Sequence, residues 1–218
     1  MLSDLANIDI NPDLTNIYGK LDGADLSIQN ECHKAKGFRK IHLELANLGD
    51  GLHILHCVFF PDPLYEIPIF GVDIIARGSF LTAAIVDISP VSENLPDFIQ
   101  NKLEEISFPN FSQIRSLPSW GEIFSPYVHF IRPENKQEEI IFFNIVNSYL
   151  TILLEYIALT SAEDSQSISS LVRYKYQYRY CTQQKLNDKT RNVLSKAFNE
   201  EWADIYIETL LFDFPDPL

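Results

Sequence analysis

The first 90 residues contain short runs rich in β-branched and aromatic residues, separated by tight turn signals. Three of these signals, LDG at 21–23, NLGDG at 47–51 and RGS at 77–79, each lie between two such runs, as in a β-hairpin. Six strands joined in this way predict an antiparallel meander, and this pattern restricts the fold more than any other feature. The predicted strands are 16–21, 24–31, 39–47, 52–60, 67–76 and 81–88.

The remaining residues show helical spacing of apolar positions around one irregular, proline-rich segment. The run at 140–159 is long and apolar, but Asn144, Asn147 and Glu155 interrupt it, so we interpret it as a core helix and not a membrane span. RYKYQYRYC at 173–181 fits either an edge strand with a basic outer face or the start of a helix. The predicted helices are 95–106, 134–158, 187–198 and 200–212, and the irregular segment is 109–133.

Strands first and helices later are typical of an α+β fold. We expect a three-layer α/β/α sandwich in which helices flank a central antiparallel meander, and one domain over 1–218. The N-terminus lacks a basic segment followed by an apolar one, so we expect no signal peptide.

Composition excludes several classes of protein. The chain carries 17 Lys and Arg against 30 Asp and Glu, a net charge of −13, which argues against nucleic acid and anionic membranes as partners. Cys32, Cys57 and Cys181 are far apart and form no CxxC pair, so zinc ribbons, iron–sulfur clusters and a disulfide framework are not expected. We therefore expect a cytoplasmic protein. No glycine-rich nucleotide motif, GxSxG or HExxH is present.

Polar side chains interrupt three neighbouring predicted strands. His42 and Glu44 share one face of strand 39–47, and His56 lies on the next strand. If NLGDG pairs Ala46 with Leu52, then His42 lies opposite His56 and Glu44 opposite Ile54. Asp73 stands in an otherwise apolar strand, where we expect a buried carboxyl group.

Three interpretations of these polar residues remain open. They are a solvated sheet face, a metal site, or a centre for proton transfer. The metal site would use His42, Glu44, His56 and His129. In the proton-transfer interpretation, a buried Asp73 has a raised pKa and exchanges a proton with His56.

Long stretches of the chain resemble the ferredoxin-dependent bilin reductases. The matching segments are FRKIHLELANLGDGLHILHCVFFPDPLYEIPIFGVDIIA, AAIVDISPVSENLP, RSLPSWGEIFSPYVHFIRP and QQKLNDKTRNVLSKAFNEEWADIYIETLLFD, and the resemblance covers 17–213. It implies that biliverdin IXα binds between the sheet and the C-terminal helices. It also implies no bound metal, flavin or nicotinamide, because reduced ferredoxin supplies single electrons and the bilin itself becomes the radical.

The resemblance assigns roles to the polar strand residues. Asp73 would be the central proton donor, and His56 would bind the bilin lactam and share a proton with Asp73. Glu44 would protonate the D-ring vinyl group, and His42 would complete the network. The implied pocket residues are Arg115 and Lys189 at the propionates, Asn187 and Asp188 over the opposite bilin face, and Trp120, Thr82 and Val58 along the wall.

The joint presence of Glu44, His56 and Asp73 implies four-electron reduction of biliverdin IXα to phycocyanobilin. Phycoerythrobilin or a dihydrobiliverdin as product, and a non-catalytic bilin-binding protein, are the alternatives. The chain departs from the family pattern in its short N-terminus and in the hairpin at 77–81, where Thr82 follows in place of the expected Ser.

A basic stretch at 173–196 stands out from the acidic remainder. It has seven basic residues and one acidic residue, a net charge of +6. Because ferredoxin is acidic, we expect it to dock there on a monomeric enzyme, with Arg39, Lys40 and Arg132 as extensions. The predicted docking residues are Arg173, Lys175, Arg179, Lys185, Lys189, Arg191 and Lys196.

Overall fold

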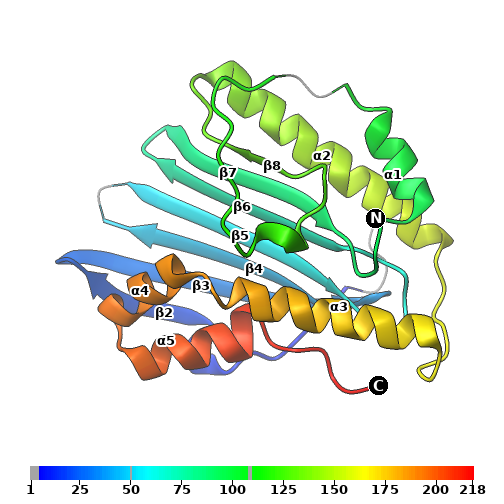
Figure 1. The fold of residues 1–218 in the computed structure, drawn as a ribbon. Helices are drawn as coiled ribbons and strands as arrows, with labels where there is room; N and C mark the ends of the chain where they lie inside the picture. Colours follow the sequence, from blue (N-terminus) through cyan, green and yellow to red (C-terminus); the bar gives the residue numbers. More distant parts are fainter. Residues whose placement is uncertain (1–4, 50, 108–109) are drawn as a thin grey trace.

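One antiparallel β-sheet forms the centre of the computed structural model, which describes residues 5–49, 51–107 and 110–218 (Figure 1). Residue 50 of the second turn and residue 109 of the irregular segment lie outside these ranges. Within them, the strand order is β1-β3-β4-β5-β6-β7-β8, and β2 also pairs with β3. The predicted meander is confirmed. The strands are β1 (Ala6–Asn7), β2 (Asn16–Leu21), β3 (Ala24–Ala35), β4 (Phe38–Leu48), β5 (Leu52–Pro61), β6 (Ile69–Arg77), β7 (Phe80–Ser89) and β8 (His129–Ile131).

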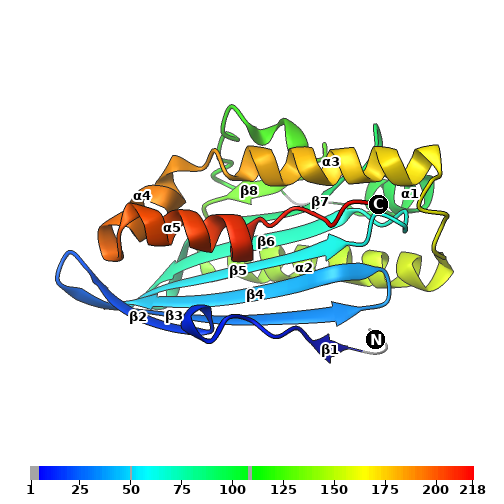
Figure 2. The same ribbon diagram turned by 90° about the horizontal axis from the view of Figure 1, so that it is seen from below.

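Helices cover both faces of the sheet, so the predicted three-layer sandwich is confirmed (Figure 2). One face carries α1 (Asp97–Glu104) and α2 (Lys136–Leu159), and we call it the α2 face. The opposite face, here called the α5 face, carries α3 (Ile168–Gln184), α4 (Asp188–Ala197) and α5 (Glu200–Tyr206). A π-helical turn, Ile207–Leu211, extends α5 directly.

Side-chain alternation along each strand builds two separate cores. Ile41 and Val72 pack towards α2, in the core that contains Tyr149. Ala46 and Val58 pack in the other core, beside Tyr206. The apolar segment predicted as a core helix is α2, which is long and apolar enough to cross a membrane, but its inner face packs on the sheet.

The ambiguous segment 173–181 is helical, as part of α3. Its buried residues Arg173, Gln177 and Tyr180 recur every three or four positions, so they lie on one side of the helix. Lys175 and Arg179 lie on the exposed side. The edge-strand alternative is therefore wrong.

The predicted register between β4 and β5 is wrong by two residues. Leu48 pairs with Leu52, so only residues 49–51 form the connection. Gly49 and Gly51 both have positive φ angles, +25° and +77°, which allows this tight turn. Because side chains alternate with a period of two, the shift changes each residue's partner but not its face.

Candidate active site

The corrected register places four polar residues in a single row across the α5 face. Asn30 pairs with Glu44, Glu44 with His56, and His56 with Asp73. Directly paired residues of antiparallel strands lie on one face, with neighbouring strands about 4.8 Å apart. His42 lies one row away, opposite Val58. The structure therefore brings together all four residues predicted to be catalytic.

His56 and Asp73 form a hydrogen-bonded ion pair through Nδ1 and Oδ1. Burial alone would lower the pKa of His56, but the charge and the hydrogen bond of Asp73 outweigh burial and raise it. His56 is 13% exposed, whereas the Asp73 side chain is 48% exposed. The prediction of a buried Asp73 is therefore wrong. Val72 and Ile74, the apolar residues on either side of Asp73, lie on the α2 face.

His42 is fully buried and its Nε2 lies 2.9 Å from Asn30 Oδ1. Burial, reinforced by the charges of His56 and Lys40, lowers the pKa of His42 well below its usual value. The two imidazole rings are 5.8 Å apart, so a histidine with a lowered pKa lies beside one with a raised pKa. Among the described residues, neither His42 Nδ1 nor His56 Nε2 has a hydrogen-bond partner, although both atoms are buried. Each imidazole therefore keeps one nitrogen that the described residues do not use.

Glu44 lies beside His56 and receives its closest contact from α5. The hydroxyl of Tyr206 is 2.5 Å from Glu44 Oε2 and 2.9 Å from Asn30 Oδ1. Burial raises the pKa of Glu44 above its usual value. Sequence reasoning missed both Tyr206 and Asn30, because neither belongs to a motif and they are 176 residues apart.

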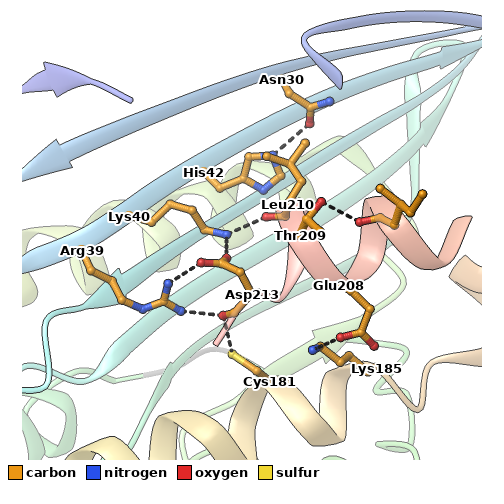
Figure 3. A network of polar contacts seen from close by, with 11 residues as sticks. Asn30, Arg39, Lys40, His42, Cys181, Lys185, Glu208, Thr209, Leu210 and Asp213 are labelled. Carbon is orange, nitrogen blue, oxygen red and sulfur yellow. Dashed lines mark hydrogen bonds and ion pairs between the residues drawn. The ribbon is translucent and has the colours of Figure 1, made fainter. Parts of the chain in front are cut away.

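The C-terminal segment closes over this site. Lys40 Nζ donates to Leu210 O at 2.6 Å and forms an ion pair with Asp213. Arg39 holds the same carboxylate at 2.7 Å (Figure 3). The segment between these anchors places the Phe212 ring edge-on to His56, with centroids 5.8 Å apart. Arg39 and Lys40 are therefore fastened to the C-terminal segment, and the suggestion that they extend the docking surface is wrong.

Arg115 lies in the row of Asp73, at the edge of the sheet. Its backbone N–H donates to Phe130 O, and its guanidinium lies 5.0 Å from the centroid of the Phe130 ring. Phe130 pairs with Ile85, which pairs with Asp73. Three strand spacings thus separate Arg115 from Asp73, about 14 Å along the α5 face. Arg115 is exposed.

The three predicted pocket-wall residues occupy different environments. Val58 is buried on the α5 face beside His42. Trp120 packs against the same core, with its ring 6.1 Å from that of Phe124. Thr82 lies at an irregularity in the β6–β7 pairing, and its hydroxyl donates to Ile75 O at 3.1 Å.

The three residues predicted on the helical side of the pocket begin α4. Asn187 is the N-cap, Asp188 opens the helix and Lys189 follows it. The Asn187 side chain donates to Thr190 Oγ1 at 3.1 Å, while Asp188 and Lys189 are exposed. They lie among the helices of the α5 face.

The four-ligand metal site is wrong. His129 pairs with Val86, whose side chain belongs to the core of the α2 face, and the His129 ring is 6.1 Å from Tyr149 of α2. His129 therefore lies across the sheet from His42 and His56. Within the described residues, no group of three or more His, Cys, Asp or Glu side chains is placed to hold a metal ion.

The predicted basic docking stretch is only partly exposed. Arg173 is 3% exposed and donates to Pro63 O and Glu163, so its assignment to a docking surface is wrong. Lys185 is paired with Glu208, and Arg191 with Asp204. The exposed members are Lys175, Arg179, Lys189 and Lys196.

Comparison with known proteins places the chain in a family. The sequence profile of the ferredoxin-dependent bilin reductases matches residues 1–213, and the chain belongs to this family of oxidoreductases. It is 49% identical over 217 residues to the phycocyanobilin:ferredoxin oxidoreductase of Prochlorococcus marinus strain MIT 9313, covering 100% of this chain and 82% of the relative. It is 53% identical over 214 residues to the protein of the same name from Synechococcus sp. strain CC9902, covering 98% and 87%.

A solved structure shares the fold. The crystal structure of tomato phytochromobilin synthase in complex with biliverdin aligns with a TM-score of 0.78 and 20% sequence identity. The alignment covers 95% of this chain and 76% of the tomato chain. This likeness supports the three-layer architecture.

Proposed function

We propose that this chain reduces biliverdin IXα to phycocyanobilin with four electrons from ferredoxin. The observation that carries the proposal is the row of Glu44, His56 and Asp73 on one sheet face, with His42 beside it. The names of the relatives at about 50% identity support this substrate and product. The enzyme would need no bound cofactor, because the bilin accepts each electron from ferredoxin in turn.

Proton supply is the task that the row performs. Four electrons must be matched by four protons, and each added electron makes the bilin more basic. The His56–Asp73 pair shares a proton across a hydrogen bond, and half of the Asp73 side chain is open to a substrate. An acid in that position can protonate the reduced bilin without a bulk-water step.

Glu44 provides a second, separate acid one strand from His56. Since burial raises its pKa, Glu44 carries a proton at a pH where an exposed glutamate has lost it. Two acids at different places along the row are suited to protonate two different carbons. We therefore assign the D-ring vinyl group to Glu44 and the central protonation to Asp73.

Substrate orientation would come from cations at two edges of the site. Arg115 at the sheet edge and Lys189 at the start of α4 are exposed, and both groups bind carboxylates well. His56 Nε2, which has no partner in the described chain, would donate to the bilin lactam. Val58 and Trp120 would line the apolar wall, with Thr82, Asn187 and Asp188 completing the pocket.

The proposal is tested by incubating the protein with biliverdin IXα and reduced ferredoxin under oxygen scavenging. The expected product is phycocyanobilin, identified by its absorption spectrum and chromatography. Phycoerythrobilin or a dihydrobiliverdin would keep the reaction class but replace the proposed product. Tight biliverdin binding without turnover would contradict the proposal and leave a bilin-binding protein.

Ferredoxin docking is proposed on the exposed basic residues of α3 and α4 that are not assigned to the bilin, which are Lys175, Arg179 and Lys196. Lys175→Glu should raise the KM for ferredoxin severalfold and weaken its salt dependence. Lys102→Glu, on α1 at the opposite face, is the matched control. An unchanged KM in Lys175→Glu would count against this surface. A monomeric, cytoplasmic enzyme remains part of the proposal.

A further inference from the structure

One buried hydrogen-bond chain links the N-terminal region, β3, β4 and α5. It begins at the carbonyl of Leu14, which accepts from Asn30 Nδ2 at 2.8 Å. A carbonyl can only accept, so this contact fixes the orientation of the Asn30 amide. Asn30 Oδ1 therefore faces His42 and Tyr206, each 2.9 Å away (Figure 3 shows the contact with His42).

The orientation of Asn30 determines where the protons of its neighbours lie. Oδ1 is an acceptor with two lone pairs, so it accepts one hydrogen from each neighbour. His42 must then carry its proton on Nε2, which leaves Nδ1 as an acceptor. Tyr206 has a single hydroxyl proton, and that proton is directed to Asn30.

The contact between Tyr206 and Glu44 is a short 2.5 Å. If Tyr206 donated to an ionised Glu44, its oxygen and Asn30 Oδ1 would be two acceptors 2.9 Å apart with no hydrogen between them. A neutral Glu44 that donates to Tyr206 gives both Asn30 Oδ1 and the Tyr206 hydroxyl a partner with a hydrogen between them. Unsatisfied buried polar groups are costly, so the second arrangement is favoured.

We propose that Asn30 and Tyr206 are positioning residues that hold the Glu44 carboxyl in its neutral form and fix the tautomer of His42. The role of Glu44 as an acid in the reaction rests on the proposed function. The neutral state of Glu44 in the ligand-free protein does not depend on that function. When Glu44 gives its proton to a substrate carbon, the Tyr206 hydroxyl can turn from Asn30 and donate to the new carboxylate. Solvent then returns the proton to Glu44.

The surroundings of Glu44 are consistent with this arrangement. The titratable groups that face it are His56 on β5, Asp73 on β6 and Tyr206 on α5. Burial, the largest effect, and the charge of Asp73 raise the pKa of Glu44, while the charge of His56 lowers it. A hydrogen bond donated by Tyr206 would also lower this pKa, but the proposed arrangement directs the Tyr206 proton to Asn30. The π-helical turn that follows Tyr206 includes Leu210, whose carbonyl oxygen accepts a hydrogen bond from Lys40. This bond holds the end of α5 on the sheet.

The first test is a carbon-13 NMR titration of the ligand-free protein labelled at glutamate Cδ. The Glu44 signal is assigned by its loss in Glu44→Gln. At pH 6, where an ordinary glutamate is ionised, Glu44 should show the shift of a neutral acid. An ionised Glu44 at pH 6 would overturn the proposal, whatever the protein does with bilins.

The second test removes the acceptor that holds the Tyr206 proton. In Asn30→Leu that proton is released to Glu44, so the ionisation constant of Glu44 should rise at least tenfold. The matched control is Tyr149→Phe, which removes a buried hydroxyl hydrogen bond on the α2 face. A Glu44 titration in Asn30→Leu that equals that of the control would contradict the role of Asn30.

The third test keeps the fold intact by removing only an oxygen. Tyr206→Phe should lower kcat about tenfold with an unchanged KM for biliverdin, and partly reduced bilin should accumulate as in Glu44→Gln. A merely structural role would slow all steps equally. If the Tyr206→Phe variant turned over biliverdin at the wild-type rate and accumulated no partly reduced bilin, the role of Tyr206 would be overturned. If wild-type protein makes no bilin product, the proposed function fails and the titration still decides this inference.

Discussion

The two faces of the sheet are built by the same strands but have opposite characters. Cys57 and Val72 face the α2 side and pack in or against an apolar core, whereas their neighbours His56 and Asp73 face the α5 side and belong to the polar row. Both faces bury an apolar core, but the α5 face also carries the row of polar groups, which reduce stability unless each has a partner. The difference shows that side-chain alternation lets the same strands place reactive groups on one face and keep them away from the core of the other.

The largest effect is expected from damage to the α2 face. Phe142 of α2 is completely buried in that core, so Phe142→Ala should lower the free energy of unfolding by about 3–5 kcal/mol. Denaturant unfolding measures this loss, and kcat per folded molecule should stay within about twofold. A specific loss of kcat would show that the faces are coupled.

The second effect concerns the α5 face, where a substitution should lower turnover and leave the free energy of unfolding nearly unchanged. Asp73→Asn removes the proposed central acid and should lower bilin turnover by about 10²–10³-fold. Since the Asp73 side chain is half exposed, stability should change little. Spectroscopic titration with biliverdin should show retained binding. Unchanged turnover would remove Asp73 from the mechanism.

A third effect comes from Asp87, a buried carboxyl on the α5 face. It pairs with Gly71 in the row of His42 and accepts hydrogen bonds from Ser125 N and Oγ and from Ser89 Oγ. Burial raises the pKa of Asp87 to about 6. The folded chain then binds more protons than the unfolded chain between pH 4 and 6, so stability falls as pH rises through that window.

A shift of two pKa units corresponds to about 3 kcal/mol. Urea unfolding of the wild type relative to Asp87→Asn should show this decrease between pH 4 and 6, with no further change above it. A difference between the two proteins that does not vary with pH would contradict the assignment. The same comparison for Phe142→Leu, on the α2 face, should show no trend over that range.

The smallest effect is expected at the C-terminal segment that covers the α5 face. Asp213→Asn weakens the contacts of Arg39 and Lys40. Because Asp213 is about one-third exposed, the loss is limited to about 1 kcal/mol. Amide exchange should then accelerate roughly fivefold in residues 207–213 and stay unchanged in α2. Equal acceleration in both segments would indicate global destabilisation.

Much of the fold was predictable because it depends on local patterns. The strands end where glycine-containing turns occur, and their period-two alternation shows which residues share a face. The helical state of 173–181 was not predictable, since alternating tyrosines and cations fit both a strand and a helix. Packing of Arg173, Gln177 and Tyr180 decided it, because these residues are buried together only on a helix.

The site was predictable in its residues and less so in its geometry. The resemblance named Asp73, His56, Glu44 and His42, and the structure brings all four to one face. The partner of Glu44 depended on turn length, and a three-residue connection moved it from Ile54 to His56. The exposure of Asp73 depended on which face its apolar neighbours occupy.

The sequence by itself determined the strands, the faces of their side chains and the acids that one face carries, because these follow from interactions between near neighbours. Only the tertiary structure decided the partners of those acids. Asn30 and Tyr206 meet across 176 residues, and Asp213 reaches back to Arg39 and Lys40. Such contacts form only when the helices pack on the sheet, because no local pattern specifies which distant side chain will satisfy a buried polar group.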